Sequence, residues 1–372
     1  MLLDLPLRFL CRPISLSWLT QSRKIMDLCS VISRLNALTP PALAESWDNV
    51  GLLVEPSPPH QVRKLLLTND LTEDVLEEAL QLGANMVLSY HPPIFKALKR
   101  LTWTGWKERL MVKALENRLA IYSPHTACDA LPNGVNDWLG RALGTCVSIP
   151  LCPSSSLSHP GGFGHLLEFS CDPSHTVMSR LKSLQDVSVR FYPVRQDGKD
   201  GSRISLSCSQ KALLQVLPIL AEDEQVYRNV ELLALQKPPM SDTGMGRLCT
   251  LPEPISIATA LERAKEHLGL PHLRLALGRG KTLESLVSFM AVCAGSGSSI
   301  LSGVSADLYL TGEMSHHDVL DAVSEGRSVI LCEHSNSERG YLQELRGQIE
   351  EKLDRKVQVL VSQKDQDPLQ VV

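Results

Sequence analysis

The sequence lacks two features that would each point to a particular class of ligand. It has no excess of basic charge, because 37 Lys and Arg face 41 Asp and Glu, and the formal net charge is −4. A protein that binds the nucleic-acid backbone would instead carry a basic stripe. No apolar run reaches the roughly 18–20 residues that a membrane-spanning helix needs. We therefore expect neither nucleic acid nor a membrane as a direct ligand.

The sequence also lacks a C-x-x-C motif, internal repeats and a phosphate-binding P-loop. Its ten cysteines are scattered, and several lie inside apolar stretches, such as Cys293 and Cys332. This distribution is typical of buried free thiols in a reducing compartment and not of a disulfide framework or a zinc ribbon.

The first 25 residues differ in composition from the rest of the chain. They hold four basic residues, one acidic residue and several serines, which is typical of a mitochondrial transit peptide. Pro6 and Pro13, however, interrupt any amphipathic helix. Residues 1–25 are thus a candidate transit peptide or leader, and both interpretations stay open. The folded part is expected to begin near Met26.

From Met26 the apolar residues alternate between the period of a helix and the short runs of buried strands. Strands are predicted at 64–70, 85–90 and 119–123, with helices at 71–84 and 107–118 between them. The same alternation returns between 255 and 362. Strands alternating with helices predict an α/β fold whose largely parallel sheets are covered on both faces.

The middle of the chain follows another order. After a Ser/Pro/Gly-rich linker at 153–164, the pattern predicts β-α-β-β-α-β within residues 160–240, the order of a ferredoxin-like unit. We therefore expect a discontinuous two-lobed α/β core with an inserted ferredoxin-like domain. The expected lobes are residues 26–152 and 243–372.

Histidine and carboxylate side chains that can bind a metal ion follow three predicted strands, at the points where the strands end. Ligands of open α/β sheets bind outside the carboxyl ends of the strands, and the three strands are expected to lie side by side. His125 and Asp129 have i,i+4 spacing, as do His334 and Glu338, and this spacing places both members of a pair on one helix face. Histidine and carboxylate ligands without a thiolate fit Zn, Mn, Fe, Co or Ni. The candidates are His91, His125, Asp129, His334 and Glu338.

Three further motifs are weaker. The loop "CAGSGSS" (293–299) has the composition of an anion-binding loop, and equally of a tight strand–helix turn. The segment "TGEMSHH" (311–317) could place Glu313 and the adjacent histidines at the rim of the same cleft. In "ESWDNVGLLV" (45–54) we expect a structural role, with Trp47 packing and the Asp-Asn pair shaping a turn.

These motifs together resemble the Ngg-interacting-factor-three-like family: "ESWDNVGLLV", "SYHPPIF", "YSPHTACDALPNGVNDWL", "CAGSGSS", "DLYLTGEMSHHD" and "EHSNSERG" occur in the family's order. The resemblance implies a two-lobed α/β fold with a dinuclear metal cleft, an inserted domain similar to PII or CutA proteins, and homodimers or closed homo-hexamers. Bacterial relatives are often labelled GTP cyclohydrolase I type 2. Animal members are linked to corepression and to the cytoplasm and nucleus.

The family's metal ligands fall on His91, Asp129, His334 and Glu338. Where the family commonly has His-His, this chain has Tyr90-His91, and a phenol binds divalent metal less well than imidazole at neutral pH. The expected cofactor is therefore one or two divalent ions. His125 has no firm ligand role in the family. It is a candidate for a residue that does not bind the metal itself but orients a metal ligand or a water.

The resemblance favours a metal-binding oligomer that acts as an interaction partner of transcription regulators, in a corepressor-type role. The alternative is a metal-dependent hydrolase of a small phosphorylated or heterocyclic substrate. A third hypothesis is a metal-handling or metal-sensing protein regulated through the inserted domain. The expected localisation is cytoplasmic and nuclear, or mitochondrial if residues 1–25 act as a presequence.

Overall fold

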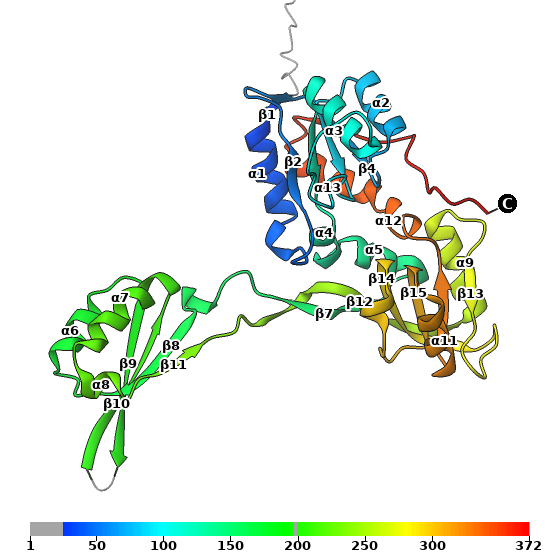
Figure 1. Ribbon diagram of the computed structural model, residues 1–372. Helices are drawn as coiled ribbons and strands as arrows, with labels where there is room; N and C mark the ends of the chain where they lie inside the picture. The colour runs from blue at the N-terminus through cyan, green and yellow to red at the C-terminus, as the bar shows by residue number, and fades with distance from the viewer. Residues whose placement is uncertain (1–24, 197–198, 372) are drawn as a thin grey trace, which may run out of the picture.

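The computed structural model describes residues 25–196 and 199–371. The candidate leader therefore lies outside the described residues, except for its last residue. Within the described part of the chain, no helix is both long enough and apolar enough to cross a membrane. The chain forms a mixed α/β fold with three main sheets of five, six and four strands, which confirms the predicted fold class (Figure 1).

The five-stranded sheet belongs mostly to the N-terminal part of the chain. Its strand order is β17-β4-β5-β6-β2, in which the first four strands are parallel and β2 is antiparallel to β6. The strand bounds are β2 Gly51–Val54, β4 Lys64–Thr68, β5 Met86–Ser89, β6 Ala120–Ser123 and β17 Gln358–Val361. The C-terminal strand β17 thus joins the sheet formed by the N-terminal lobe.

Both faces of this sheet are covered, as the apolar strand interiors require. Leu65 and Leu67 of β4 point into the core that also contains α1 (Leu28–Leu38) and α13 (Leu342–Lys352). Leu66, between them, points to the opposite core. That second core holds the buried faces of α2 (Glu73–Gln81) and α3 (Trp106–Glu116).

The six-stranded sheet has the order β13-β16-β15-β14-β12-β7. Its central strands β14, β15 and β16 are parallel, and the strands outside them are antiparallel. The bounds are β7 Val147–Ser155, β12 Pro239–Ser256, β13 Arg274–Ala276, β14 Leu286–Ser296, β15 Leu308–Glu313 and β16 Ser328–Leu331. Two helices accompany it, α9 Ile257–Leu268 and α11 His316–Ser324.

One continuous hydrophobic core joins these two sheets. It contains Leu67 and Leu88 from the five-stranded sheet together with Met290 and Leu310 from the six-stranded sheet. Trp138 of α5 (Val135–Gly140) is part of the same core. Because the two sheets share buried side chains, the ends of their strands are held in a fixed relation to each other.

The four-stranded sheet forms a separate unit with its own core. It follows β-α-β-β-α-β, with a further short helix, and its strand order β11-β8-β10-β9 is antiparallel throughout. The elements are β8 His165–Ser170, α6 Thr176–Lys182, β9 Val187–Gln196, β10 Lys199–Cys208, α7 Gln210–Ala221, α8 Glu224–Tyr227 and β11 Glu231–Ala234. Its assignment as ferredoxin-like or PII/CutA-like stays a prediction.

Two sequence-based expectations about elements were wrong. Residues 153–155, expected in the linker, belong to β7, which pairs with β12 to form the ribbon that leads to the inserted unit (Figure 1). Near the C-terminal end, α12 (Asn336–Arg339) and α13 are separate helices. Finally, β16 does not lie beside β5 and β6, because it belongs to the six-stranded sheet.

Candidate metal centre

Three of the candidate side chains meet between the two large sheets. His91 follows β5 of the five-stranded sheet, whereas His334 and Glu338 follow β16 of the six-stranded sheet. Each of the three offers a ligand atom, and these atoms lie within 4.8 Å of one another. The strand ends therefore converge from two sheets that face each other across the shared core, and not along one sheet edge.

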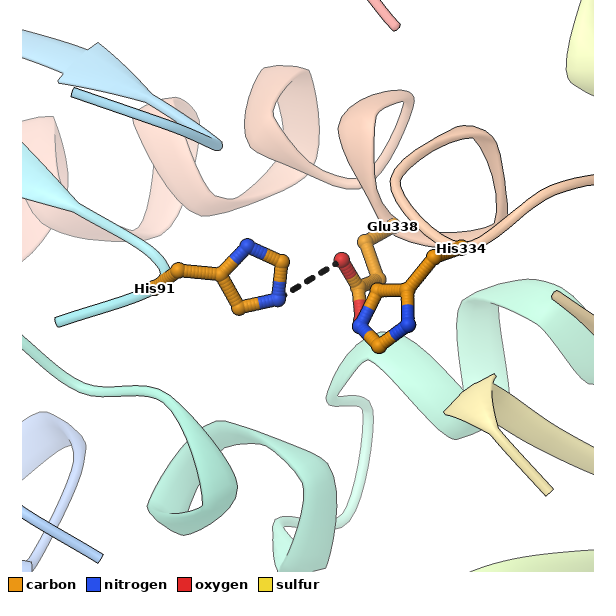
Figure 2. Close-up of side chains that lie close together, drawn as sticks. All are labelled: His91, His334 and Glu338. Carbon is orange, nitrogen blue, oxygen red and sulfur yellow. Dashed lines mark ion pairs between the residues drawn. The ribbon is translucent and has the colours of Figure 1, made fainter. Parts of the chain in front are cut away.

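The carboxylate of Glu338 lies between the two imidazoles (Figure 2). Its Oε2 is 3.3 Å from His91 Nε2, and its Oε1 is 3.5 Å from His334 Nε2. Glu338 is buried, with 3% of its surface exposed. The i,i+4 spacing of His334 and Glu338 places both on one side of the turn that leads into α12, as the sequence indicated.

Carboxylates behind each imidazole set the orientation of the ring. Asp70 Oδ1 lies 3.0 Å from His91 Nδ1, and Glu313 Oε1 lies 3.0 Å from His334 Nδ1. Each carboxylate accepts a hydrogen bond from the Nδ1–H, which leaves the lone pair of Nε2 pointing into the cluster. This is the arrangement by which carboxylates usually orient metal-binding histidines. Asp70 was not recognised from the sequence, because nothing in its spacing links it to His91.

The cluster has the chemistry of a cation site. His91 Nε2 is buried and has no hydrogen-bond partner, since the contact with Glu338 does not have the geometry of a hydrogen bond. Burial acts to raise the pKa of Glu338, but the adjacent His91 and His334 hold it below its ordinary value. Glu338 is therefore a carboxylate beside two imidazole nitrogens, a donor set that fits a divalent transition metal or zinc.

The electrostatics of His91 agree with this interpretation. Burial acts to lower its pKa, but the charge of Glu338 and the hydrogen bond to Asp70 raise it to about 11. Two carboxylates around one ring thus create a strong preference for positive charge at this position. A metal ion and a proton would compete for the same Nε2 lone pair.

The comparisons with known proteins agree with the fold and the motifs. The model of the family Duf34/NIF3 (NGG1p interacting factor 3) matches residues 26–368. The chain belongs to the Duf34/NIF3 family. It is 58% identical to NIF3-like protein 1 of Rattus norvegicus over 360 residues, covering 96% of each chain. It is 30% identical to NGG1-interacting factor 3 of Saccharomyces cerevisiae over 340 residues, covering 88% of this chain and 90% of the yeast protein.

A solved structure of the family supports the architecture. The Bacillus cereus protein related to NIF3 superposes with a TM-score of 0.66 at 24% identity, covering 94% of this chain and 99% of that chain. At this level of identity the likeness speaks for the fold alone.

Asp129, the fourth residue expected from the NIF3 resemblance, lies beside the cluster but not within the group of three. It is part of α4 (Thr126–Ala130) and accepts a short hydrogen bond from the hydroxyl of Tyr90. Burial raises the pKa of Asp129 to about 6, although His125 and Tyr90 act to lower it. The phenol of Tyr90 thus engages one oxygen of the Asp129 carboxylate. The role of Asp129 as a metal ligand stays a prediction.

His125 lies next to the cluster and lines the same cavity as His334 and Glu338. Its ring centroid is 5.2 Å from that of His91, and its Nδ1 is 2.7 Å from Asp48 Oδ1. Asp48 also accepts hydrogen bonds from the backbone N–H and the hydroxyl of Thr126. His125 has a φ of 34°, a strained conformation for a non-glycine residue. Asp48 therefore does more than shape a turn: it fixes His125 at the cavity.

Sequence reasoning missed this partnership. Asp48 and His125 are 77 residues apart, so no local spacing could reveal the pair. Trp47, expected to pack, lies edge-to-face with Phe95 and His125 and is 59% exposed. Cys128, the neighbour of Asp129 in α4, is buried in the main core. Glu313 contacts His334 through a hydrogen bond to Nδ1, while His316 and His317 are exposed at the start of α11.

The loop 293–299 lines the cavity, and three of its backbone N–H groups are used within the fold. The backbone N–H of Ala294 donates to Asn136 Oδ1, that of Gly295 to Ser337 Oγ, and that of Gly297 to the carbonyl of Glu313. Gly295 has a φ of +66°, and a Cβ there would lie 2.8 Å from Glu338 Oε1. Glycine is thus required because the chain passes directly against the metal-competent side chains.

A cavity of about 380 Å³ opens next to the cluster. His334 and Glu338 lie in its wall, with Asp129 and His125 nearby in the same wall. The volume is at the lower end of the range of small-molecule sites. A ligand in this cavity would therefore lie directly beside an ion held by the cluster.

Proposed function

We propose that this chain binds a divalent metal ion through His91, His334 and Glu338, with Asp129 as a further ligand for one or two ions. The observation that carries the proposal is the buried, unpartnered Nε2 of His91, which points at Glu338 while Asp70 holds the opposite nitrogen. Such a nitrogen is costly to bury unless something binds it. Zn, Mn, Fe, Co and Ni all fit this donor set.

We further propose that the metal-binding protein acts as an interaction partner of transcription regulators, in a corepressor-type role. The support is its 30% identity over nearly the whole chain to the yeast protein named NGG1-interacting factor 3. The role is proposed for the cytoplasm and nucleus, with the protein as a homodimer or homo-hexamer. In this account the metal site stabilises the junction of the two large sheets, since its ligands come from both.

The second candidate is a metal-dependent hydrolase, which the cavity favours because it adjoins the cluster. A bound divalent ion supplies Lewis acidity there. The chain contributes His125, whose Nδ1 is engaged by Asp48, so that Nε2 is the nitrogen available to accept a proton from a ligand. Asp129, with a pKa of about 6, is a second group that can exchange a proton near neutral pH.

The two candidates differ in what they require of His334. We expect an interaction partner to keep its binding to a transcription regulator of the NGG1 class after His334→Ala, measured by co-purification with the purified regulator. The control is His317→Ala, which removes an exposed histidine outside the cluster. Loss of the partner in His334→Ala but not in His317→Ala would contradict a metal-independent interaction. Metal-dependent turnover of small esters or heterocycles, absent in His334→Ala, would favour the hydrolase.

A further inference from the structure

The cavity beside the His91–His334–Glu338 cluster is lined by both polar and apolar side chains. His334 and Glu338 contribute polar atoms to the lining. Trp47, Met245 and Ile300 contribute apolar surface to it. A ligand that fills the cavity must therefore present a polar group as well as an apolar surface.

Trp47, one of the lining residues, is held in place by other aromatic rings. Its ring lies edge-to-face with Phe95, with centroids 5.9 Å apart and planes at 65°, and with His125 at 6.0 Å and 74°. Phe95 in turn lies 6.4 Å from His125 at 81°. The three rings support one another in the geometry that aromatic pairs prefer.

Hydrogen bonds fix the two loops that carry these rings. Asn49 donates from its side chain to the carbonyl of Ile94 at 2.6 Å, which ties the Trp47 segment to the Phe95 segment. The neighbouring Asp48 anchors the same segment to His125. Trp47 and Phe95 are nevertheless 59% and 43% exposed. A large apolar ring that is held in place yet left exposed is typical of a binding surface.

The charges of the cavity restrict the polar group of the ligand. Among the described residues that line it, none is Lys or Arg, while Glu45, Asp129 and Glu338 are acidic. The loop N–H groups of Ala294 and Gly295 are already used. A metal ion would therefore be the main positive charge available to an anionic group, and the several charges of a polyphosphate would meet carboxylates without a cationic side chain to offset them.

From these observations we infer that the cavity binds a planar aromatic or heteroaromatic acid with a single anionic group. The ring stacks on Trp47, Phe95 positions Trp47 from outside, and the anionic group reaches the metal held by His91, His334 and Glu338. The inference rests on the metal site proposed above and names the ligand class of the second candidate function. It disfavours nucleoside triphosphates as ligands.

The test measures calorimetric binding of 1-naphthoate to the full chain loaded with Zn²⁺ and freed of excess ion. The comparison ligands are the saturated analogue decahydronaphthalene-1-carboxylate, acetate and GTP. We expect the planar acid to bind about tenfold or more tightly than its saturated analogue, the typical effect of stacking on one aromatic side chain. GTP should bind no better than acetate.

Variants test whether this preference depends on Trp47 and Phe95. Trp47→Ala should abolish the preference for the planar acid, Trp47→Phe should retain part of it, and Phe95→Leu should weaken it. The control Trp103→Ala removes a tryptophan that is equally exposed, at 58%, and does not line the cavity, so it should change nothing. The zinc content of each sample, measured in parallel, should stay equal in all four variants.

Four results would overturn the inference. These are no preference for the planar acid in the zinc-loaded wild type, an unchanged preference in Trp47→Ala, equal binding of 1-naphthoate by the metal-free chain, or GTP binding tighter than 1-naphthoate. A wild-type chain that holds no zinc would contradict the proposed metal site, whereas one that holds zinc but shows no ring preference contradicts the ligand class alone.

Discussion

At the scale of single residues, the site depends on carboxylates that hydrogen-bond to its histidines and orient their rings. Asp70, Glu313 and Asp48 each accept a hydrogen bond from a histidine Nδ1. The histidines were visible in the sequence because they follow strand ends. Their carboxylate partners were not, because acidic residues are common and each partner lies 21 or more residues away from its histidine.

We predict that Asp48→Asn destabilises the metal-free protein in a pH-dependent way. Burial acts to raise the pKa of Asp48, but hydrogen bonds from His125 and Thr126 hold it below its ordinary value. A carboxyl with a lowered pKa in the folded state stabilises the fold above its unfolded pKa of about 3.9, and this contribution is lost as the pH falls through the folded value. Urea unfolding in EDTA at pH 7 should show a loss of about 1–3 kcal/mol.

The difference between wild type and Asp48→Asn should shrink below about pH 4, where the wild-type carboxyl becomes protonated. A difference that stays constant from pH 7 to pH 3 would contradict the ionised Asp48–His125 interaction. Asp354→Asn is a suitable comparison, because Asp354 makes its contacts at the surface, where ion pairs contribute little.

At the scale of elements, prediction from the sequence succeeded where the hydrophobic period was clear. The continuous apolar sequences of β4, β5, β6 and β14 to β16 predict parallel strands, because both faces of such strands are covered. The β7–β12 ribbon was missed because β12 mixes Pro, Gly and charged residues with apolar ones, without a clean alternation. The sheet to which β16 belongs depends on tertiary pairing, which no local pattern encodes.

The turn between α12 and α13 contains Gly340, a position where the lack of a Cβ can be tested. A Cβ on Gly340 would lie 2.3 Å from the ring of Trp138, which is buried in the shared core. We therefore predict that Gly340→Ala destabilises the fold by about 1–3 kcal/mol, as overpacking usually does. The measurement is the midpoint of urea unfolding.

Gly347 is the matched control for this prediction, because it lies within α13 and a Cβ there would meet nothing within 4 Å. Gly347→Ala should stabilise the protein by about 0.5–1 kcal/mol through helix propensity and reduced unfolded-state entropy. Equal effects of the two substitutions would show that Trp138 does not limit the space at Gly340.

At the scale of the whole molecule, the cluster of His91, His334 and Glu338 belongs to the two large sheets and not to the inserted unit. The two large sheets share one core, while the inserted sheet has a separate one. The β7–β12 ribbon connects them, and Ser155 pairs with Pro239 near the far end of that ribbon (Figure 1). The chain therefore returns to nearly the same place after the insertion.

We predict that the inserted unit can be removed without loss of the metal site. Replacing residues 156–238 by a two-residue Asn-Gly turn should close β7 and β12 as a hairpin. The shortened protein should fold and hold the same amount of metal per chain as the full-length protein, measured by plasma mass spectrometry. A folded but metal-free product would show that the inserted unit contributes to the site after all.

The central claim, that His91, His334 and Glu338 form a metal centre, is tested most directly by metal content per protomer. Plasma mass spectrometry of protein purified without chelator should find about one ion or more per wild-type chain. His334→Ala should lose it, and His317→Ala should retain it. Tyr90→His should raise the content towards two, because it frees Asp129 and adds an imidazole. Equal metal content in wild type and His334→Ala, or none in either, would contradict the account.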